Sequence, residues 1–216
     1  AIAFLSDLHI GSKLFLEKPF KRFLEWIKGG VGDSKQKELA GKIKYISICG
    51  DIVDGIGIYP GQENELEIVD IFEQYDAFTK LMEEIPDYIH VIVAPGNHDA
   101  VRNADPQPPL PKTLLPDLYQ YSNFHFIPSP GYVEIHGMKM LAYHGTSFDG
   151  MISRIENASY ESIDRLMEIV LRKRHVHPNY GEKPIIPTKE EELIIDPVPD
   201  IFHCGHVHTN AYTIYH

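Results

Sequence analysis

The sequence is poor in cysteine, in positive charge and in long apolar runs, and each shortage narrows the class of protein. Its two cysteines, Cys49 and Cys204, form no Cys-x-x-Cys pair, which fits a reducing cytoplasm and two buried apolar side chains. The formal charge of −11 argues against a free-standing binder of nucleic acid or of anionic membranes. No signal peptide is visible, and no apolar run approaches the roughly 18 residues of a membrane span. We therefore expect a cytoplasmic protein without a membrane partner.

The apolar content, 43% of 216 residues, is enough for one sizeable core, so we expect a single domain over residues 1–216. The chain opens directly on the strand-like AIAFLSDLH and stops in the alternating AYTIYH, which predicts a final strand over 211–216. It therefore reads as a piece of a longer protein cut at both sides. Two irregular insertions interrupt it, the proline-rich segment 105–117 and the long connector 177–199. We expect both to shape binding.

Short β-type runs alternate with amphipathic helical patterns, which predicts βαβ units and a mostly parallel sheet in the first half. The β-type runs cover residues 1–9, 45–55, 90–99, 139–145 and 200–208. Helices are expected over KPFKRFLEWIKGG, from about Asn64 to Ile85, and around Tyr160 to His175. In the second helix, Val69 and Phe72 belong to the predicted buried stripe. The stretch from Phe124 to Tyr143 is predicted to form hairpin strands, with a turn at His136-Gly137.

Each β-type run ends in a polar cluster, and ligand chemistry in α/β sheets gathers beyond the carboxyl ends of strands. Seven side chains in these clusters are candidate metal ligands: Asp7, His9, Asp51, Asn97, His144, His206 and His208. A glycine lies beside or near each of them, which lets the backbone turn sharply close to an ion. The clusters therefore predict one shared site at the strand ends.

Taken singly, each candidate also has a structural explanation. Asp7 could cap a helix, Asn97 could form an Asx turn, and His144 could be a core histidine bonded to a carbonyl. His206 and His208 could be two histidines in a polar turn. Taken together, five strand ends carry Asp, Asn or His, none carries Lys or Arg, and five of the 12 histidines fall there. Independent accidents explain that pattern poorly, so we favour a metal site.

The donor set is carboxylate, amide oxygen and imidazole without thiolate. It suits Mn, Fe or Zn in an open site rather than a closed structural zinc, and we favour Mn. Seven ligands are too many for one transition ion, so we expect two divalent metal ions. Asp51 has candidate ligands on both sides and can bridge the pair. The ions would supply the positive field that this acidic chain lacks, so a phosphate substrate is compatible with its charge.

The order Asp-x-His, Gly-Asp-x-x-Asp, Gly-Asn-His-Asp, His, Gly-His-x-His resembles the motif series of the calcineurin-like metallophosphoesterases. More narrowly, SDLHIGS, CGDIVDGIGIYPGQ, APGNHDAVR, YHGTSFD and IDPVPDIFHCGHVHTNAY are similar to the small-subunit family of archaeal DNA polymerase D. The resemblance spans residues 7 to 208. It implies an α/β fold built as a two-sheet β-sandwich flanked by helices. Eukaryotic relatives of that family have lost most metal ligands, whereas this sequence keeps all of them.

The resemblance also implies roles for the candidate residues. One ion would be held by Asp7, His9, Asp51 and His208, and the other by Asp51, Asn97, His144 and His206. His98 would bind no metal but would protonate the departing sugar oxygen, and the Asp54 carboxylate would orient His98. No role follows for three neighbours: Asp99, Asp149 and His203.

The activity that the resemblance implies is metal-dependent hydrolysis of DNA phosphodiesters. In the family this is a 3′ to 5′ proofreading exonuclease, acting on a single-stranded 3′ end together with the large catalytic subunit of DNA polymerase D. Two alternatives stay open: a small-molecule phosphodiesterase or phosphatase on the same dinuclear scaffold, and a mainly structural polymerase subunit. The motifs define the metal chemistry rather than the substrate, and only the residues around them favour DNA.

Overall fold

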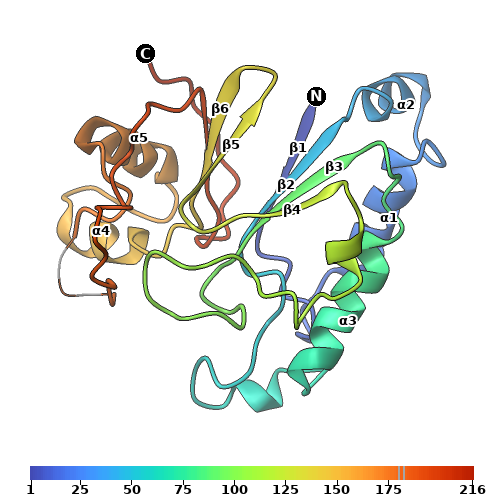
Figure 1. Cartoon of the computed structure of the whole chain (residues 1–216), viewed down its shortest axis with the longest axis horizontal. Coiled ribbons are helices and arrows are strands. Elements are labelled where there is room, and N and C mark those ends of the chain that lie inside the picture. Colours follow the sequence, from blue (N-terminus) through green and yellow to red (C-terminus); the bar gives the residue numbers. More distant parts are fainter. Residues whose placement is uncertain (180, 182) are drawn as a thin grey trace.

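The computed structural model describes residues 1–179, 181 and 183–216, and it contains two sheets with helices on their outer faces (Figure 1). The first sheet is parallel and has the order β1 (Ile2–Leu5), β2 (Tyr45–Cys49), β3 (His90–Ala94) and β4 (Phe124–Phe126). The second has the order β5 (Gly131–Ile135), β6 (Met138–Ala142) and β7 (Ile201–His203). β5 and β6 are antiparallel, and β6 and β7 are parallel. The predicted α/β class and the parallel sheet are confirmed.

The helices form the two outer layers. They are α1 (Glu17–Ile27), α2 (Ser34–Ala40), α3 (Ile71–Met82), α4 (Phe148–Arg154) and α5 (Ile163–Lys173), with short 3-10 turns η1 (Gln62–Asn64) and η2 (Leu118–Gln120). α1 and α3 pack on the first sheet, whereas α4 and α5 pack on the second, at the opposite side of the molecule (Figure 1). In the part of the chain that the structure describes, no helix has the length and apolar character of a membrane span.

The central strands β2 and β3 are buried on both faces, as their nearly continuous apolar runs predict. Alternate side chains point to opposite faces of a strand. Ile46 and Val91 therefore contact the helical layer, whereas Ile92 packs against Ile135 and Met140 of the second sheet. The two sheets thus face each other across an apolar layer. This packing fixes the strand ends of both sheets relative to one another.

Both cysteines belong to this apolar interior, Cys49 as a buried side chain and Cys204 as a partly buried one. Cys49 lies between the sheets with Ala94 and Ala142, and Cys204 packs with the cluster beneath α4 and α5. Burial raises the pKa of both thiols well above its ordinary value. The sequence-based interpretation of Cys49 and Cys204 as apolar fillers agrees with this environment.

The helix expected from Asn64 to Ile85 is shorter than predicted, because Asp70 starts it. The Asp70 carboxylate accepts hydrogen bonds from the backbone N–H groups of Phe72 (2.8 Å) and Glu73 (3.1 Å). The chain before it bonds elsewhere, with both Glu67 N and Ile68 N donating to Gly11 O. Two members of the predicted buried stripe, Val69 and Phe72, are 63% and 62% exposed. Those two assignments were wrong.

Other boundaries also differ from the prediction. β4 was expected in a hairpin but pairs in parallel with β3, so only β5 and β6 form the hairpin that turns at His136-Gly137. Residues 211–216 form no strand, and Tyr212 is 91% exposed. An alternating pattern is insufficient where no neighbouring strand supplies the backbone partners. Helix α2 was missed, although the Asp33 and Gln36 side chains form a reciprocal capping box at its start.

The two irregular segments lie against each other. Asp105 N donates to Pro184 O (3.0 Å), and Ile186 N donates to Asp105 O (2.8 Å). The buried Asp105 carboxylate accepts further bonds from Tyr143 Oη and Thr146 Oγ1 (both 2.9 Å), beyond the end of β6. Residues 105–117 and the described part of 177–199 contain no helix or strand, and residues 180 and 182 lie outside the described part. The segments are therefore anchored next to the end of β6.

Buried His203 gives the fold a predictable response to pH. Its Nδ1 lies 3.0 Å from Ser47 Oγ between the sheets, and burial lowers its pKa to about 4. In the unfolded chain this group takes up a proton near pH 6.5, so the free energy of unfolding should fall by up to about 3 kcal/mol between pH 6.5 and pH 4. His203→Asn should remove this part of the pH dependence. Urea unfolding of the metal-free protein at both pH values tests this prediction, with His216→Asn as the control. The same change in the free energy of unfolding between the two pH values for His203→Asn and for the wild type would refute the prediction.

Candidate metal centre

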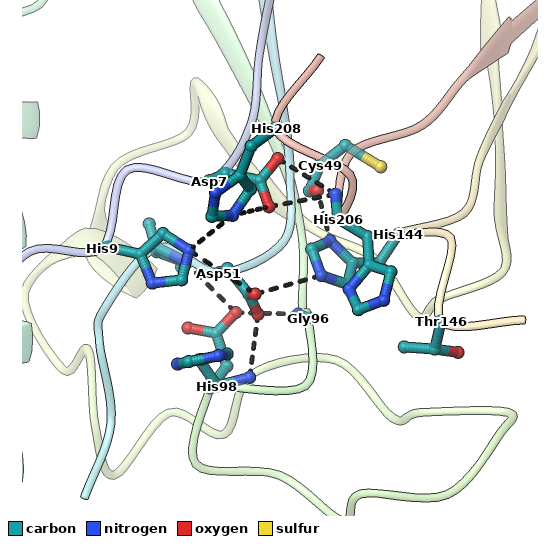
Figure 2. Close-up of polar contacts among 12 residues, drawn as sticks. Asp7, His9, Cys49, Asp51, Gly96, His98, His144, Thr146, His206 and His208 are labelled. Carbon is teal, nitrogen blue, oxygen red and sulfur yellow. Dashed lines mark hydrogen bonds and ion pairs between the residues drawn. The ribbon is translucent and has the colours of Figure 1, made fainter. Parts of the chain in front are cut away.

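The segments that follow five strands meet at one edge of the two sheets (Figure 2). Among the described residues, three groups of side chains have ligand atoms within 4.8 Å of one another: Asp7, His9 and His208; Asp51, His144 and His206; and His9, Asp54 and His98. These groups include every predicted ligand except the amide side chain of Asn97. The sequence prediction that the strand-end clusters converge is confirmed.

The first group contains two imidazoles that face each other. His9 Nε2 lies 3.1 Å from His208 Nε2, and His208 Nε2 lies 3.5 Å from Asp7 Oδ1. Two neutral imidazoles can satisfy this contact only if one nitrogen donates and the other accepts. Asp7 also accepts two bonds from the backbone N–H of His206, both 3.0 Å. The ends of β1 and β7, almost 200 residues apart in sequence, are thereby joined.

The second group is centred on Asp51, which is 1% exposed. Its Oδ2 lies 3.2 Å from His144 Nε2 in its own group and 3.8 Å from His9 Nε2 in the first group (Figure 2). Asp51 therefore connects the two groups. Burial alone would raise the pKa of Asp51, but the charge of nearby His144 holds that pKa well below its ordinary value. Asp51 is therefore an ionised carboxylate that faces candidate ligands on both sides, as a bridging residue would.

Two predicted ligands each have a buried polar atom that lacks a hydrogen-bond partner among the described residues: Asn97 Oδ1 and His144 Nε2. Leaving such an atom unsatisfied costs about 1–3 kcal/mol, and coordination of a cation would satisfy each of them. The other ring nitrogen of His144 bonds Cys49 O at 2.9 Å, which directs Nε2 toward Asp51. The Cys49 sulfur faces His203 O instead. Oxygen and imidazole nitrogen donors without thiolate fit two divalent ions of the Mn, Fe or Zn kind.

The backbone at the site is held in an uncommon conformation. Eight described non-glycine residues have positive φ, and five of them are predicted ligands: Asp7 (55°), His9 (50°), Asp51 (50°), His206 (75°) and His208 (52°). Each such residue costs about 1–3 kcal/mol and persists only where its surroundings enforce it. The strain arises because the backbone turns back after each strand and directs the candidate ligand toward a common point.

Two glycines make the close approach possible. Gly50 has φ 84°, and a Cβ there would lie 2.2 Å from His144 Nδ1. A Cβ on Gly96 would lie 2.2 Å from Asp51 Oδ1 and 2.4 Å from Asp51 N. Both glycines therefore pack the backbone of one strand end against a candidate ligand from another.

Gly96→Ala should displace Asp51 and thereby weaken metal binding. We expect a loss of about 1–3 kcal/mol in the free energy of unfolding, together with metal content below that of the wild type. Gly137→Ala is the matched control, because that glycine has φ 81° and open space around the new Cβ. It should cost about 1 kcal/mol of backbone strain and leave the metal content unchanged. Full metal occupancy in Gly96→Ala would contradict the packing argument.

His98 is held by the backbone rather than by the carboxylate of Asp54. Its ring Nδ1 lies 2.8 Å from Asp54 O, and its backbone N–H donates to Asp51 Oδ1 at 2.8 Å. The Asp54 carboxylate instead contacts His9 Nδ1 (3.0 Å) and Gln62 Nε2 (2.9 Å). The expectation that the Asp54 carboxylate orients His98 was therefore wrong, because the Asp54 backbone carbonyl makes this contact. Because a carbonyl only accepts, His98 Nδ1 carries a proton and Nε2 is left to exchange one.

The structure gives functions to residues whose role the sequence left open. Buried Asp99 accepts from Gly96 N (2.8 Å) after β3 and from Ile52 N and Val53 N (both 3.4 Å) after β2, and so braces these two segments. Burial and the charge of Asp51 raise the pKa of Asp99 to about 7. Asp149 Oδ2 lies 2.9 Å from His206 Nε2 and fixes that ring. This bond lowers the pKa of Asp149 to about 2.

Gln62 is a further residue that sequence analysis missed. It is fully buried, and its Nε2 donates both to Asp54 O (2.8 Å) and to Asp54 Oδ2 (2.9 Å). Its Oε1 accepts from Ile58 N at 2.9 Å. Gln62 therefore holds the group that anchors His98. It ends the segment CGDIVDGIGIYPGQ, but its residue type alone gave no indication of this role.

The fold and the site together define an α/β protein with two facing sheets and a centre of aspartate and histidine at their strand ends. The chain belongs to the family of the B subunits of DNA polymerases alpha and epsilon, and the match to the family covers residues 2–213.

Several similar relatives are archaeal proteins. The DNA polymerase II small subunit of Archaeoglobus fulgidus is 50% identical over 212 residues, which cover 96% of this chain and 42% of that protein. The corresponding subunit of Methanothermobacter thermautotrophicus is 47% identical and is matched over 100% of this chain and 45% of its own length. The expected resemblance to archaeal polymerase small subunits is confirmed. The chain spans less than half the length of these relatives.

Proposed function

We propose that this chain is the metal-dependent phosphodiesterase part of an archaeal DNA polymerase small subunit and hydrolyses DNA as a 3′ to 5′ exonuclease. The observation that carries the proposal is the convergence of six predicted ligands on one point, five of them on strained backbone. Strain of this kind is typical of functional sites. The motif order and the two facing sheets favour a calcineurin-like metallophosphoesterase fold.

The candidate residues divide into two ligand sets that share Asp51. One set is Asp7, His9, Asp51 and His208, and the other is Asp51, Asn97, His144 and His206. Mn is the favoured metal, and the same donors suit Fe or Zn. Two divalent ions that share a carboxylate activate water and neutralise the charge of a phosphate.

His98 is the proposed general acid, and Asp54 positions it. The Asp54 carbonyl fixes Nδ1, so Nε2 is the atom that would protonate the departing sugar oxygen. The backbone N–H of His98 donates to Asp51 Oδ1 and so ties the same residue to the shared carboxylate. The segment after β3 therefore fixes the position of the proposed proton donor relative to the two ligand sets.

The proposed partners are a single-stranded 3′ end of DNA and a large catalytic polymerase subunit. A net charge of −11 gives the chain little attraction for DNA, so delivery by a second subunit is favoured. The names of the archaeal relatives support this assignment, since a small subunit implies a larger one. The irregular segments beside the end of β6 are candidates for these contacts.

Incubation of the full-length protein and its large subunit with Mn²⁺ and single-stranded DNA labelled at the 5′ end tests the proposal. We expect stepwise shortening from the 3′ end, blocked by a chelator. Hydrolysis of p-nitrophenyl phosphate without cleavage of DNA would favour the phosphatase alternative instead. No hydrolysis of DNA, bis-p-nitrophenyl phosphate or phosphomonoester would favour a purely structural subunit.

A further inference from the structure

Tyr59 is an exposed aromatic side chain beside His98. The two ring centroids lie 6.4 Å apart with the planes at 62°, and Tyr59 is 38% exposed. Most side chains of the candidate centre are buried or half-buried, whereas this ring offers an apolar surface that a substrate can reach. It belongs to the loop between β2 and α3, and nothing in the ligand sets requires it.

The Tyr59 ring is fixed through its hydroxyl, and the loop that carries it is fixed through its backbone. Its hydroxyl donates to Glu65 Oε2 at 2.8 Å, and the preceding Ile58 N donates to buried Gln62. Gln62 also bonds Asp54 O, the atom that anchors His98. The loop therefore positions the exposed ring and the proposed general acid through one shared network. A ring fixed before binding loses little conformational entropy when a ligand contacts it.

We propose that Tyr59 is a stacking platform for the nucleobase next to the scissile phosphate. The inference rests on the proposed function, because it takes His98 as the group that protonates the departing sugar oxygen. Tyr59 lies on the His98 side of the centre, so its base belongs to the nucleotide that supplies that oxygen. In 3′ to 5′ cleavage, this is the penultimate nucleotide of the strand.

The charges around the ring favour a base over a phosphate as the contacting group. Glu65 holds the hydroxyl, and Glu63 and Asp54 lie on the same short segment. An anionic phosphate would be repelled there, whereas every base presents an uncharged π-face. Stacking on one aromatic side chain changes affinity by about 5- to 150-fold and tolerates all four bases.

The test compares Tyr59→Ala and Tyr59→Phe in the full-length protein with its large subunit. Affinity for a fluorescent single-stranded oligonucleotide is measured by anisotropy, independently of cleavage, and KM is measured alongside. Three oligonucleotides are used: a normal strand, one with an abasic penultimate nucleotide and one with an abasic terminal nucleotide. Tyr121→Ala is the matched control, because Tyr121 is also exposed and donates to a glutamate, Glu83, at the opposite end of the first sheet.

For the normal strand, Tyr59→Ala should weaken binding by about 5- to 150-fold, whereas Tyr59→Phe, which keeps the ring and loses only the bond to Glu65, should weaken it much less. Removing the penultimate base should weaken wild-type binding by a similar factor and should abolish the effect of Tyr59→Ala. Equal weakening on the normal and abasic strands would show a structural role and overturn the proposal. Unchanged affinity would overturn it as well. A wild type that binds but does not cleave would refute the exonuclease while leaving the stacking result readable.

Discussion

Asp51→Ala should remove both metal ions and abolish hydrolysis of every phosphoester. Asp51 lies between the two ligand groups, 3.2 Å from His144 Nε2 and 3.8 Å from His9 Nε2, so its loss removes a donor from both ligand sets. It also leaves the backbone N–H of His98 without its acceptor. Metal analysis and turnover of DNA and of bis-p-nitrophenyl phosphate, measured on one preparation, give the result. A matched replacement at exposed Asp87 should change neither.

Asp51→Asn separates the charge of this residue from its shape. The asparagine keeps one oxygen that can accept from His98 N but loses the negative charge and one donor atom. We expect the circular dichroism spectrum of this variant to match that of the wild type. We also expect the variant not to bind the two metal ions. If Asp51→Asn retained two ions and full turnover, Asp51 would not be the shared ligand.

His98→Ala should fail in a different way. His98 is in neither ligand set, so the variant should keep its ions and lose only the proton-donating contribution, about 10²- to 10⁴-fold on DNA. A deoxyribose oxygen leaves poorly without a proton, whereas nitrophenolate leaves well. The variant should therefore lose far less activity on bis-p-nitrophenyl phosphate. His136→Ala, in the exposed turn between β5 and β6, controls for the loss of an imidazole.

The ratio of the two losses decides the role of His98. A large loss on DNA with a small loss on the activated diester supports a general acid. Equal losses on both substrates would indicate a positioning role. Missing ions in His98→Ala would indicate a ligand or a structural residue, and either result would contradict the assignment.

The candidate centre was predictable because parallel strands place their carboxyl ends at one edge. A run such as YISICGD indicates a buried strand followed by a turn and a carboxylate, and five such runs can be recognised separately. The glycines beside the ligands were also recognisable, and the space around Gly96 shows why no side chain fits there. Residue type and order thus carry most of the site.

What the sequence did not reveal depends on contacts between distant segments. Asp149 reaches His206 across 57 residues, and buried Gln62 acts through the main chain of Asp54. Neither contact leaves a local pattern. The start of α3 was misplaced because Asp70 caps it while the preceding residues bond Gly11, a tertiary contact that overrides helical periodicity. β4 likewise follows its pairing with β3 rather than its hairpin-like spacing.

Electron paramagnetic resonance of the full-length protein loaded with Mn²⁺ tests the central claim most directly. If Asp51 is shared by two ions, two equivalents of Mn²⁺ should bind per chain and give the spectrum of an exchange-coupled pair. In Asp51→Asn that spectrum should be absent. A single equivalent with the six-line signal of an isolated ion, unchanged by Asp51→Asn, would contradict the two-ion centre.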